Sequence, residues 1–247
     1  MKEIQIKNFN GVIVCKFSHG KYYVHCDYTT CTFKQGATLL QGPIDGGSWA
    51  ISYVLSMYRS DKKSFLPLED IEFFADGNKT DLRHLQSAAC YLDRIFPLFR
   101  SRKSVKAFVE KELKRRHDNL TAEDVRRRFN ISPFRFERPL KTAGNELFRS
   151  MAAMGYAAGK SIFCFPWFSV TDINYFGRNI TDVAEVLTAL NKIVLLPTEY
   201  VFPSKCADRF FNNIYRVAFK SVYDWDYAFS LYSNDDDLHR TENKDSP

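Results

Sequence analysis

The sequence predicts an α/β protein with an N-terminal antiparallel β part, a core sheet and a helical subdomain inserted into that core. Short runs of alternating apolar and polar residues fill positions 2–41, which is typical of antiparallel strands. A glycine-rich loop then leads into a helical pattern, and two nearly unbroken apolar runs near residues 161 and 193 enclose a further helix. Between these parts, residues 80–158 have mostly helical spacing.

The composition is that of an ordinary globular protein. Of its 247 residues, 45% are hydrophobic and 26% are charged, which excludes a disordered chain, a collagen-like repeat and a small disulfide scaffold. No apolar run approaches the roughly 20 residues that a membrane-spanning helix needs, and positions 1–8 do not form a signal-peptide core. We therefore expect a cytoplasmic protein.

The first structural change along the chain lies near residue 42. An apolar strand at 37–41 runs into the loop Gly42-Pro-Ile-Asp-Gly-Gly, and residues 48–58 then have apolar positions at helical spacing. This order predicts a strand, a glycine loop and a helix.

The middle of the chain predicts four helices, at 81–92, at 104–116, from Thr121 with a capping box, and at 144–158. The runs at 161–165 and 193–196, with a helix at 182–191 between them, then predict buried parallel strands. We expect the divisions 1–80 (β region and phosphate-loop core), 81–158 (helical subdomain), 159–233 (the rest of the core) and 234–247 (a flexible acidic tail).

The cysteines and the basic residues give weaker indications. The six cysteines form no CxxC pair and no Cys/His ligand spacing, so we expect reduced buried thiols, no disulfide and no metal site. Basic residues crowd positions 100–128, which favours a solvated helical surface. A face for anionic lipid or for an acidic partner is the main alternative, and nucleic-acid binding is a weaker one because no aromatic residues interleave with the charges.

The loop Leu39-Leu-Gln-Gly-Pro-Ile-Asp-Gly-Gly-Ser-Trp resembles the phosphate-binding loop of ATP-binding-cassette (ABC) transporter proteins, whose pattern is GPxxxGK followed by two hydroxyl residues. Four further segments resemble that family in the same order. Residues 81–85 with 90–99 resemble the glutamine-loop region, 140–146 the LSGGQ signature, 159–169 the second Walker strand, and 193–200 the strand that ends in the switch histidine. The resemblance implies a P-loop NTPase-like, ABC-ATPase-like core sheet.

The resemblance also implies that the phosphate loop is degenerate. Such a loop binds phosphates through backbone N–H groups at a helix N-terminus, a lysine and a magnesium-binding hydroxyl. Gly42 and Gly47 are retained here. Ser48 stands at the lysine position, Trp49 at the magnesium position, and Asp45 adds a negative charge. We therefore expect ATP to bind weakly or not at all at this loop.

The other catalytic positions depart from the family as well. No carboxylate lies between residues 161 and 171, and the aspartate and glutamate of the second Walker strand correspond to 165 or 166 and to 166 or 167. The glutamine-loop position is Asp93 and the switch-histidine position is Glu199. The resemblance thus implies no ATPase activity, catalytic residue, metal or cofactor of its own, with ATP and Mg²⁺ possible only at a site shared with a partner.

The signature-like segment departs least, because Thr142, Ala143, Gly144 and Asn145 keep a hydroxyl, a glycine and an amide. In this family two domains pair head to tail, and each signature helix points at the nucleotide of the other. The segment could serve a partner's ATP, or Thr142 and Asn145 could only cap a helix that begins near Gly144.

The leading hypothesis is a non-hydrolysing ABC-type subunit with a structural or regulatory role. It would lie on the cytoplasmic face of the membrane, docked on membrane-spanning subunits and paired with a competent second cassette. The main alternative is a stand-alone protein-interaction module that keeps this fold. An ATPase with an unfamiliar site and a nucleic-acid binder are further alternatives.

Overall fold

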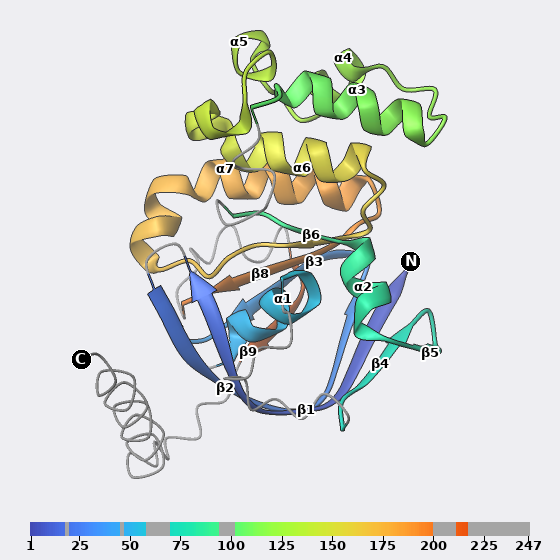
Figure 1. The fold of residues 1–247 in the computed structure, drawn as a ribbon. Helices are drawn as coiled ribbons and strands as arrows, with labels where there is room; N and C mark the ends of the chain where they lie inside the picture. The colour runs from blue at the N-terminus through green and yellow to red at the C-terminus, as the bar shows by residue number, and fades with distance from the viewer. Residues whose placement is uncertain (18–19, 45–46, 58–69, 94–101, 200–210, 217–247) are drawn as a thin grey trace, which may run out of the picture. The chain divides into compact units, whose positions relative to one another are not determined.

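The structure is a computed structural model that describes residues 1–17, 20–44, 47–57, 70–93, 102–199 and 211–216. The chain divides into two compact units, Met1–Val217 and Ala218–Pro247, and every described residue lies in the first. Figure 1 shows its two sheets and its helices. The acidic tail predicted at 234–247 lies outside the described residues.

An antiparallel sheet forms the N-terminal β part, as the sequence predicts. Its strands are β1 (Glu3–Phe17), β2 (Gly20–Lys34), β4 (Glu72–Ala75) and β5 (Asn78–Thr80), in the order β2-β1-β4-β5. The hairpin of β4 and β5 turns at Asp76 and Gly77, both of which have positive φ. An Asp-Gly pair between short strands is the usual sequence signal of such a two-residue turn.

A parallel sheet forms the core. Its strands are β3 (Gly36–Gln41), β6 (Ala89–Tyr91), β7 (Ile162–Cys164), β8 (Ile193–Thr198) and β9 (Phe211–Arg216), in the order β6-β7-β8-β3-β9. All four pairings are parallel, so the carboxyl ends of the strands lie at one edge of the sheet. Ligands of open α/β sheets bind at that edge, which makes it the place to examine for a site.

Helices and the antiparallel sheet cover opposite faces of the parallel sheet. Leu39, Phe163 and Val194 belong to the core that packs with α6 (Leu147–Ala157) and α7 (Val170–Ala189). Their neighbours along the strands, such as Leu40, Ile162 and Leu195, pack with α1 (Ser48–Ser56) and the antiparallel sheet. The alternation follows from the two-residue period of a strand that is buried on both faces.

The middle of the chain is helical, as predicted. It contains α2 (Leu82–Ala88), α3 (Val105–Arg115), α4 (Ala122–Arg128), α5 (Pro133–Phe136) and the short 3₁₀ turns η2 (Leu140–Thr142) and η3 (Gly144–Glu146). Thr121 and Asp124 form the capping box that the sequence predicts. Within the described residues, no helix is both long and apolar enough to cross a membrane.

Three helix boundaries differ from the sequence prediction. The helix predicted at 81–92 ends at Ala88, because Ala89–Tyr91 pairs with β7 as strand β6. The helix predicted from Gly144 begins at Leu147, after the 3₁₀ turn η3. The helix predicted at 182–191 is the second half of α7, which begins at Val170. The first half of α7 is more polar, so its apolar residues do not show a clear helical spacing in the sequence.

We expect Gly155→Ala to destabilise the fold by about 1–3 kcal/mol. A Cβ at Gly155 on α6 would lie 2.8 Å from Cys90 Sγ and 2.9 Å from Phe163 Cε1, so the helix would have to move off the sheet. Gly177→Ala on α7 is the matched control, because its Cβ would meet only Ile173 Cγ2, at 3.8 Å. In the control, the free energy of unfolding should rise by about 0.5–1 kcal/mol, because alanine favours a helix interior more than glycine does. Urea unfolding measures both, and equal effects would contradict the close packing of α6.

Candidate functional site

The predicted phosphate loop joins the carboxyl end of β3 to the N-terminus of α1. Gly47 is the N-cap of α1 with φ 88°, a conformation that favours glycine, and no side chain caps the helix. Ser48 is fully buried, and its hydroxyl makes a long contact of 3.5 Å to the carbonyl of Gly42. Asp45 lies outside the described residues. The loop thus has the strand-loop-helix form of a phosphate loop, but the side chain at the lysine position does not face solvent.

Trp49 belongs to the core and does not line an open cleft. Its indole is fully buried, Nε1 donates a hydrogen bond of 2.9 Å to the Tyr91 hydroxyl, and its ring meets Tyr53 edge to face. The side chain therefore ties α1 to β6. A magnesium-binding hydroxyl at this position would have to replace one of the largest buried side chains in the protein.

The segment after β7 contacts the phosphate loop through a second tryptophan. Phe165 is buried in the core beneath α6 and α7, and Pro166 is buried too. Trp167 is half-buried, and its indole Nε1 donates a 2.9 Å hydrogen bond to the carbonyl of Gly42. Where the resemblance expects carboxylates for metal and water, this chain instead has an indole bound to the first glycine of the loop.

Glu199, at the switch-histidine position, binds the N-terminus of α7. Its Oε2 accepts a hydrogen bond of 3.1 Å from the backbone N–H of Val170. Ser169 and Asp172 add a capping box to the same helix end. A carboxylate is stabilised by the positive end of a helix dipole, so Glu199 has a structural role in this arrangement.

Asp93 follows β6 at the same sheet edge and is only 8% exposed. Together with Glu199, which follows β8, it places a second carboxyl group at the carboxyl edge of the parallel sheet. Both predicted departures thus lie at this edge.

The signature-like segment forms two 3₁₀ turns before α6. Thr142 Oγ1 donates a 2.7 Å hydrogen bond to the carbonyl of Pro139, so its proton is already used within the loop. Arg135 on α5 donates a short hydrogen bond from Nη1 to the carbonyl of Thr142. Gly144 has φ 59°, and a Cβ there would lie 3.2 Å from Arg135 Nη2. The guanidinium of Arg135 therefore lies against the glycine and holds the loop.

The capping interpretation of this segment is wrong. The N-cap of α6 is Glu146, and no side chain makes a cap hydrogen bond there. Thr142 donates to a preceding carbonyl, and the carboxylate of Glu146 accepts from the N–H and hydroxyl of Ser132. Thr142 and Asn145 are not needed to begin the helix.

Tyr91 and Arg135 contribute to these two sites and were missed in the sequence. Tyr91 on β6 accepts a hydrogen bond from Trp49 on α1, and Arg135 on α5 donates one to the carbonyl of Thr142 in a 3₁₀ turn. No local sequence pattern marks these contacts, because they depend on how the elements pack in space.

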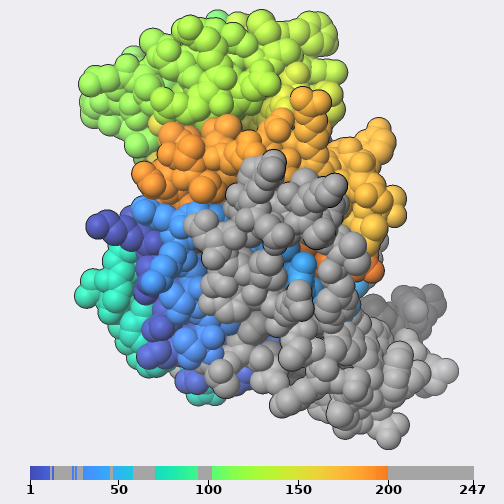
Figure 2. Space-filling view, turned by 180° about the vertical axis from the view of Figure 1, so that it is seen from behind, coloured from blue at the N-terminus to red at the C-terminus, as the bar shows by residue number. Residues whose placement is uncertain are grey.

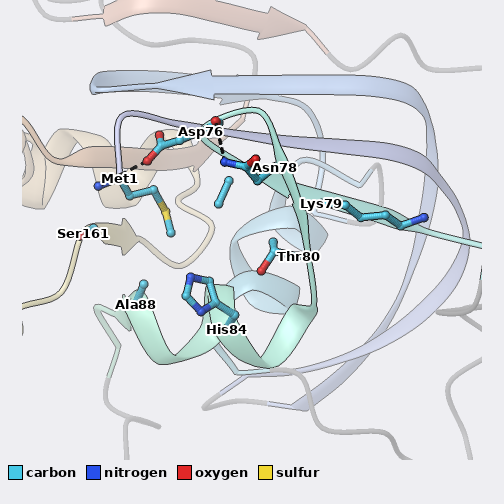
Figure 3. A pocket seen from close by; sticks show the side chains of 9 residues that line it. Met1, Asp76, Asn78, Lys79, Thr80, His84, Ala88 and Ser161 are labelled. Atoms are coloured by element: carbon cyan, nitrogen blue, oxygen red, sulfur yellow. Dashed lines mark hydrogen bonds and ion pairs between the residues drawn. The ribbon is translucent and has the colours of Figure 1, made fainter.

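A hollow of about 470 Å³ lies elsewhere, at the amino edge of the parallel sheet. Figure 3 shows Asp76, Lys79 and His84 around it, with Ala88 and Ser161 at the starts of β6 and β7. Asp76 accepts from the N–H groups of Lys2 and Glu3, which lowers the pKa of its carboxyl, and Lys79 pairs with Glu72 at 2.7 Å. Asp76 and Lys79 are thus engaged in holding the strands and the N-terminus.

Cys26, Cys31, Cys90 and Cys164 are buried free thiols, as predicted for these four. Burial raises the pKa of the Cys31 and Cys90 thiols to about 12, so both are protonated and unreactive at neutral pH. In the described part of the chain, no group of three or more His, Cys, Asp or Glu residues could hold a metal ion.

Five described basic side chains in the middle of the chain form ion pairs within the helical part. Figure 2 shows residues 102–149 gathered at one end of the unit, beside α7. The pairs are Lys106–Glu137, Arg115–Glu112, Arg116–Asp118, Arg126–Glu123 and Arg127–Glu123. These surface pairs support the interpretation of a solvated helical surface for this part of the basic stretch.

No protein-family model and no curated protein sequence matches this chain. Solved structures do match. A putative ABC transporter ATP-binding protein from Pyrococcus furiosus is 12% identical, with 87% of this chain and 97% of that chain covered and a TM-score of 0.54. The dimeric ATP-binding cassette MJ0796, bound to ADP and Pi, is 13% identical, with coverages of 87% and 94% and a TM-score of 0.52.

A bacterial Atm1-family ABC exporter with ATP bound is 15% identical, with 87% of this chain and 37% of that chain covered and a TM-score of 0.55. At these identities the likeness shows the fold. The chain has the fold of an ABC-transporter ATP-binding cassette.

Proposed function

We propose that this chain is a cassette-type subunit of a transporter that does not hydrolyse ATP at its own phosphate loop. The observation that supports this most is the bonding at the carboxyl edge of the parallel sheet. The Trp167 indole binds the Gly42 carbonyl, the Trp49 indole lies in the core, and Glu199 binds the N-terminus of α7. Groups at three of the expected catalytic positions thus hold the fold together, and their side chains are committed to protein partners.

The proposed role is structural or regulatory within a complex. Cassettes of the same fold include a dimer bound to ADP and Pi and an exporter with ATP bound, so a pair of cassettes docked on membrane-spanning subunits is a natural assembly for the fold. In this proposal the chain lies at the cytoplasmic face, forms a heterodimer with a competent cassette, and presents residues 141–145 to the partner's nucleotide. ATP and Mg²⁺ would bind only at that shared site.

We expect the purified chain to hydrolyse ATP no faster than buffer, and Ser48→Lys to remain inactive. A lysine alone supplies neither the magnesium ligand nor a carboxylate to orient water, and Trp49 stays in place. Phosphate release with and without Mg²⁺ measures both, with a competent cassette assayed in parallel and circular dichroism confirming that the buried Ser48→Lys variant folds.

Two outcomes would contradict the proposal. Wild-type turnover that disappears in Ser48→Ala would show that the loop is catalytic as it stands. Magnesium-dependent hydrolysis by Ser48→Lys would show that another carboxylate serves the site.

The alternative of a stand-alone interaction module predicts a different complex. Copurification of the chain with membrane-spanning subunits and a second cassette supports the transporter subunit. Copurification with soluble partners alone supports the module.

A further inference from the structure

We propose that α5 and the turn after it form a docking surface for an acidic segment of a partner protein. This surface, called here the α5 platform, consists of Phe134, Arg138 and Lys141, with Arg135 beside them. It uses none of the residues of the phosphate-loop edge, but Lys141 also belongs to the signature-like segment of the proposed function, and Arg135 contacts that segment. Peptide binding measures the platform without any ATPase activity, so its failure is distinct from a failure of the proposed function.

The α5 platform carries an exposed aromatic ring stacked on a cation. Phe134 is 55% exposed, one of two large hydrophobic side chains in the described residues that are this open to solvent. The guanidinium carbon of Arg138 lies 3.7 Å from the ring centroid, and that of Arg135 lies 5.5 Å away. A stacked guanidinium keeps its N–H edge free for a carboxylate, and stacking fixes its orientation before a partner arrives.

The platform is also positively charged without compensation. Among the described residues, neither Arg135, Arg138 nor Lys141 makes an ion pair, whereas most cations on α3 and α4 do. The acids nearest in sequence are engaged elsewhere: Glu137 pairs with Lys106 at 2.8 Å, and Glu146 accepts from Ser132. The two arginines at the exposed ring, together with the exposed Lys141, are therefore complementary to two or three carboxylates next to an apolar side chain.

The backbone beneath the platform is well held. The Val105 N–H donates a 3.0 Å hydrogen bond to the carbonyl of Arg138, and Ser104 forms an isolated β-bridge with Pro139. The Ser132 side chain caps the N-terminus of α5. Figure 1 shows α5 at the outer end of the helical part, away from both sheets. A rigid, outward-facing site that combines Arg with an aromatic residue has the composition of an interface hot spot.

The charge pattern favours a protein segment over nucleic acid. A nucleic-acid footprint needs a continuous row of free cations, but on the other side of α5 a hollow of about 310 Å³ is lined by Glu110, Glu123 and Glu137 as well as Lys106 and Arg126. Because Glu137 and Glu123 there pair with Lys106 and Arg126, that surface offers no continuous row of free cations to a phosphate backbone that extended beyond the platform. A short acidic segment fits within it.

The test uses the full-length chain and a fluorescein-labelled peptide of alternating Asp-Glu pairs and leucines, followed by fluorescence anisotropy. Arg138→Ala should weaken binding about tenfold, and Phe134→Ala should weaken it several-fold. Arg138→Lys should recover only part of the loss, because an ammonium neither stacks flat nor binds bidentately. Lys111→Ala, which removes a likewise exposed cation of α3, is the matched control and should bind as the wild type.

Parallel titrations with a short DNA duplex and with vesicles that contain phosphatidylserine identify the class of ligand. The proposal is overturned if the wild type shows no saturable binding of the acidic peptide, or if Lys111→Ala weakens binding as much as Arg138→Ala. It is also overturned if DNA or vesicle binding, and not peptide binding, depends on Arg138. Thermal melts of each variant separate loss of binding from loss of folding.

Discussion

Trp49→Ala should lower the free energy of unfolding by about 3–5 kcal/mol. The indole of this α1 residue is fully buried against Tyr53 of the same helix and Tyr91 of β6, so the substitution leaves a large cavity and removes the 2.9 Å hydrogen bond to the Tyr91 hydroxyl. Urea unfolding should show a midpoint at much lower denaturant concentration with an unchanged slope.

Tyr91→Phe is the matched control for that experiment. It keeps the packed ring but removes the hydroxyl that accepts from Trp49, so it should cost only about 1 kcal/mol. If Trp49→Ala cost no more than Tyr91→Phe, the indole would have to lie outside the core, and the magnesium position would be open to solvent.

The same cavity bears on the proposed function. A serine or threonine at position 49, as the resemblance would require for magnesium, removes almost as much buried surface as alanine and adds a hydroxyl to be satisfied. In this chain the position therefore serves the connection between α1 and β6. Restoring catalysis would need compensation in the core as well as new catalytic side chains.

Elements with a strong local signal could be predicted from the sequence. The loop at Gly42 between an apolar strand and a helix, and the capping box at Thr121, both appear where the pattern places them. β6 could not be predicted, because Leu82, Leu85 and Ala89 continue a helical spacing that only pairing with β7 interrupts. Three residues are too few for a strand period to appear in the sequence.

The candidate site was less predictable than the fold. The residue types at the phosphate-loop edge follow from the sequence, but their contacts do not. Glu199 could be placed at a strand end, yet its hydrogen bond to Val170 depends on where α7 begins. The bond between Trp167 and Gly42 joins residues 125 positions apart, and the sequence carries no sign of it.

Gly144→Val should lower the ATPase rate of an assembled complex with a competent cassette about tenfold or more. This expectation rests on the proposed function, in which residues 141–145 face the partner's nucleotide. Gly144 has φ 59°, where a branched side chain is strained, and its new Cβ would press on Arg135, which holds the Thr142 carbonyl. The loop must then move, and about 1.4 kcal/mol lost from the transition state slows the reaction tenfold. Phosphate release by the complex at saturating ATP measures the effect.

Gly77→Val separates loop geometry from general strain. Gly77 also has positive φ, 80°, but a Cβ there meets nothing within 4 Å, and it lies in the turn between β4 and β5. Both variants should lose about 1–2 kcal/mol of stability to backbone strain, while only Gly144→Val slows the complex. The Thr142 hydroxyl already donates to the carbonyl of Pro139, so the segment should act on the partner's nucleotide mainly through its backbone. Thr142→Ala should therefore slow the complex less than Gly144→Val.

If complexes with Gly144→Val and with Gly77→Val still assemble and hydrolyse ATP at equal rates, the hypothesis of a shared site is contradicted. A purely structural subunit would then be the better interpretation.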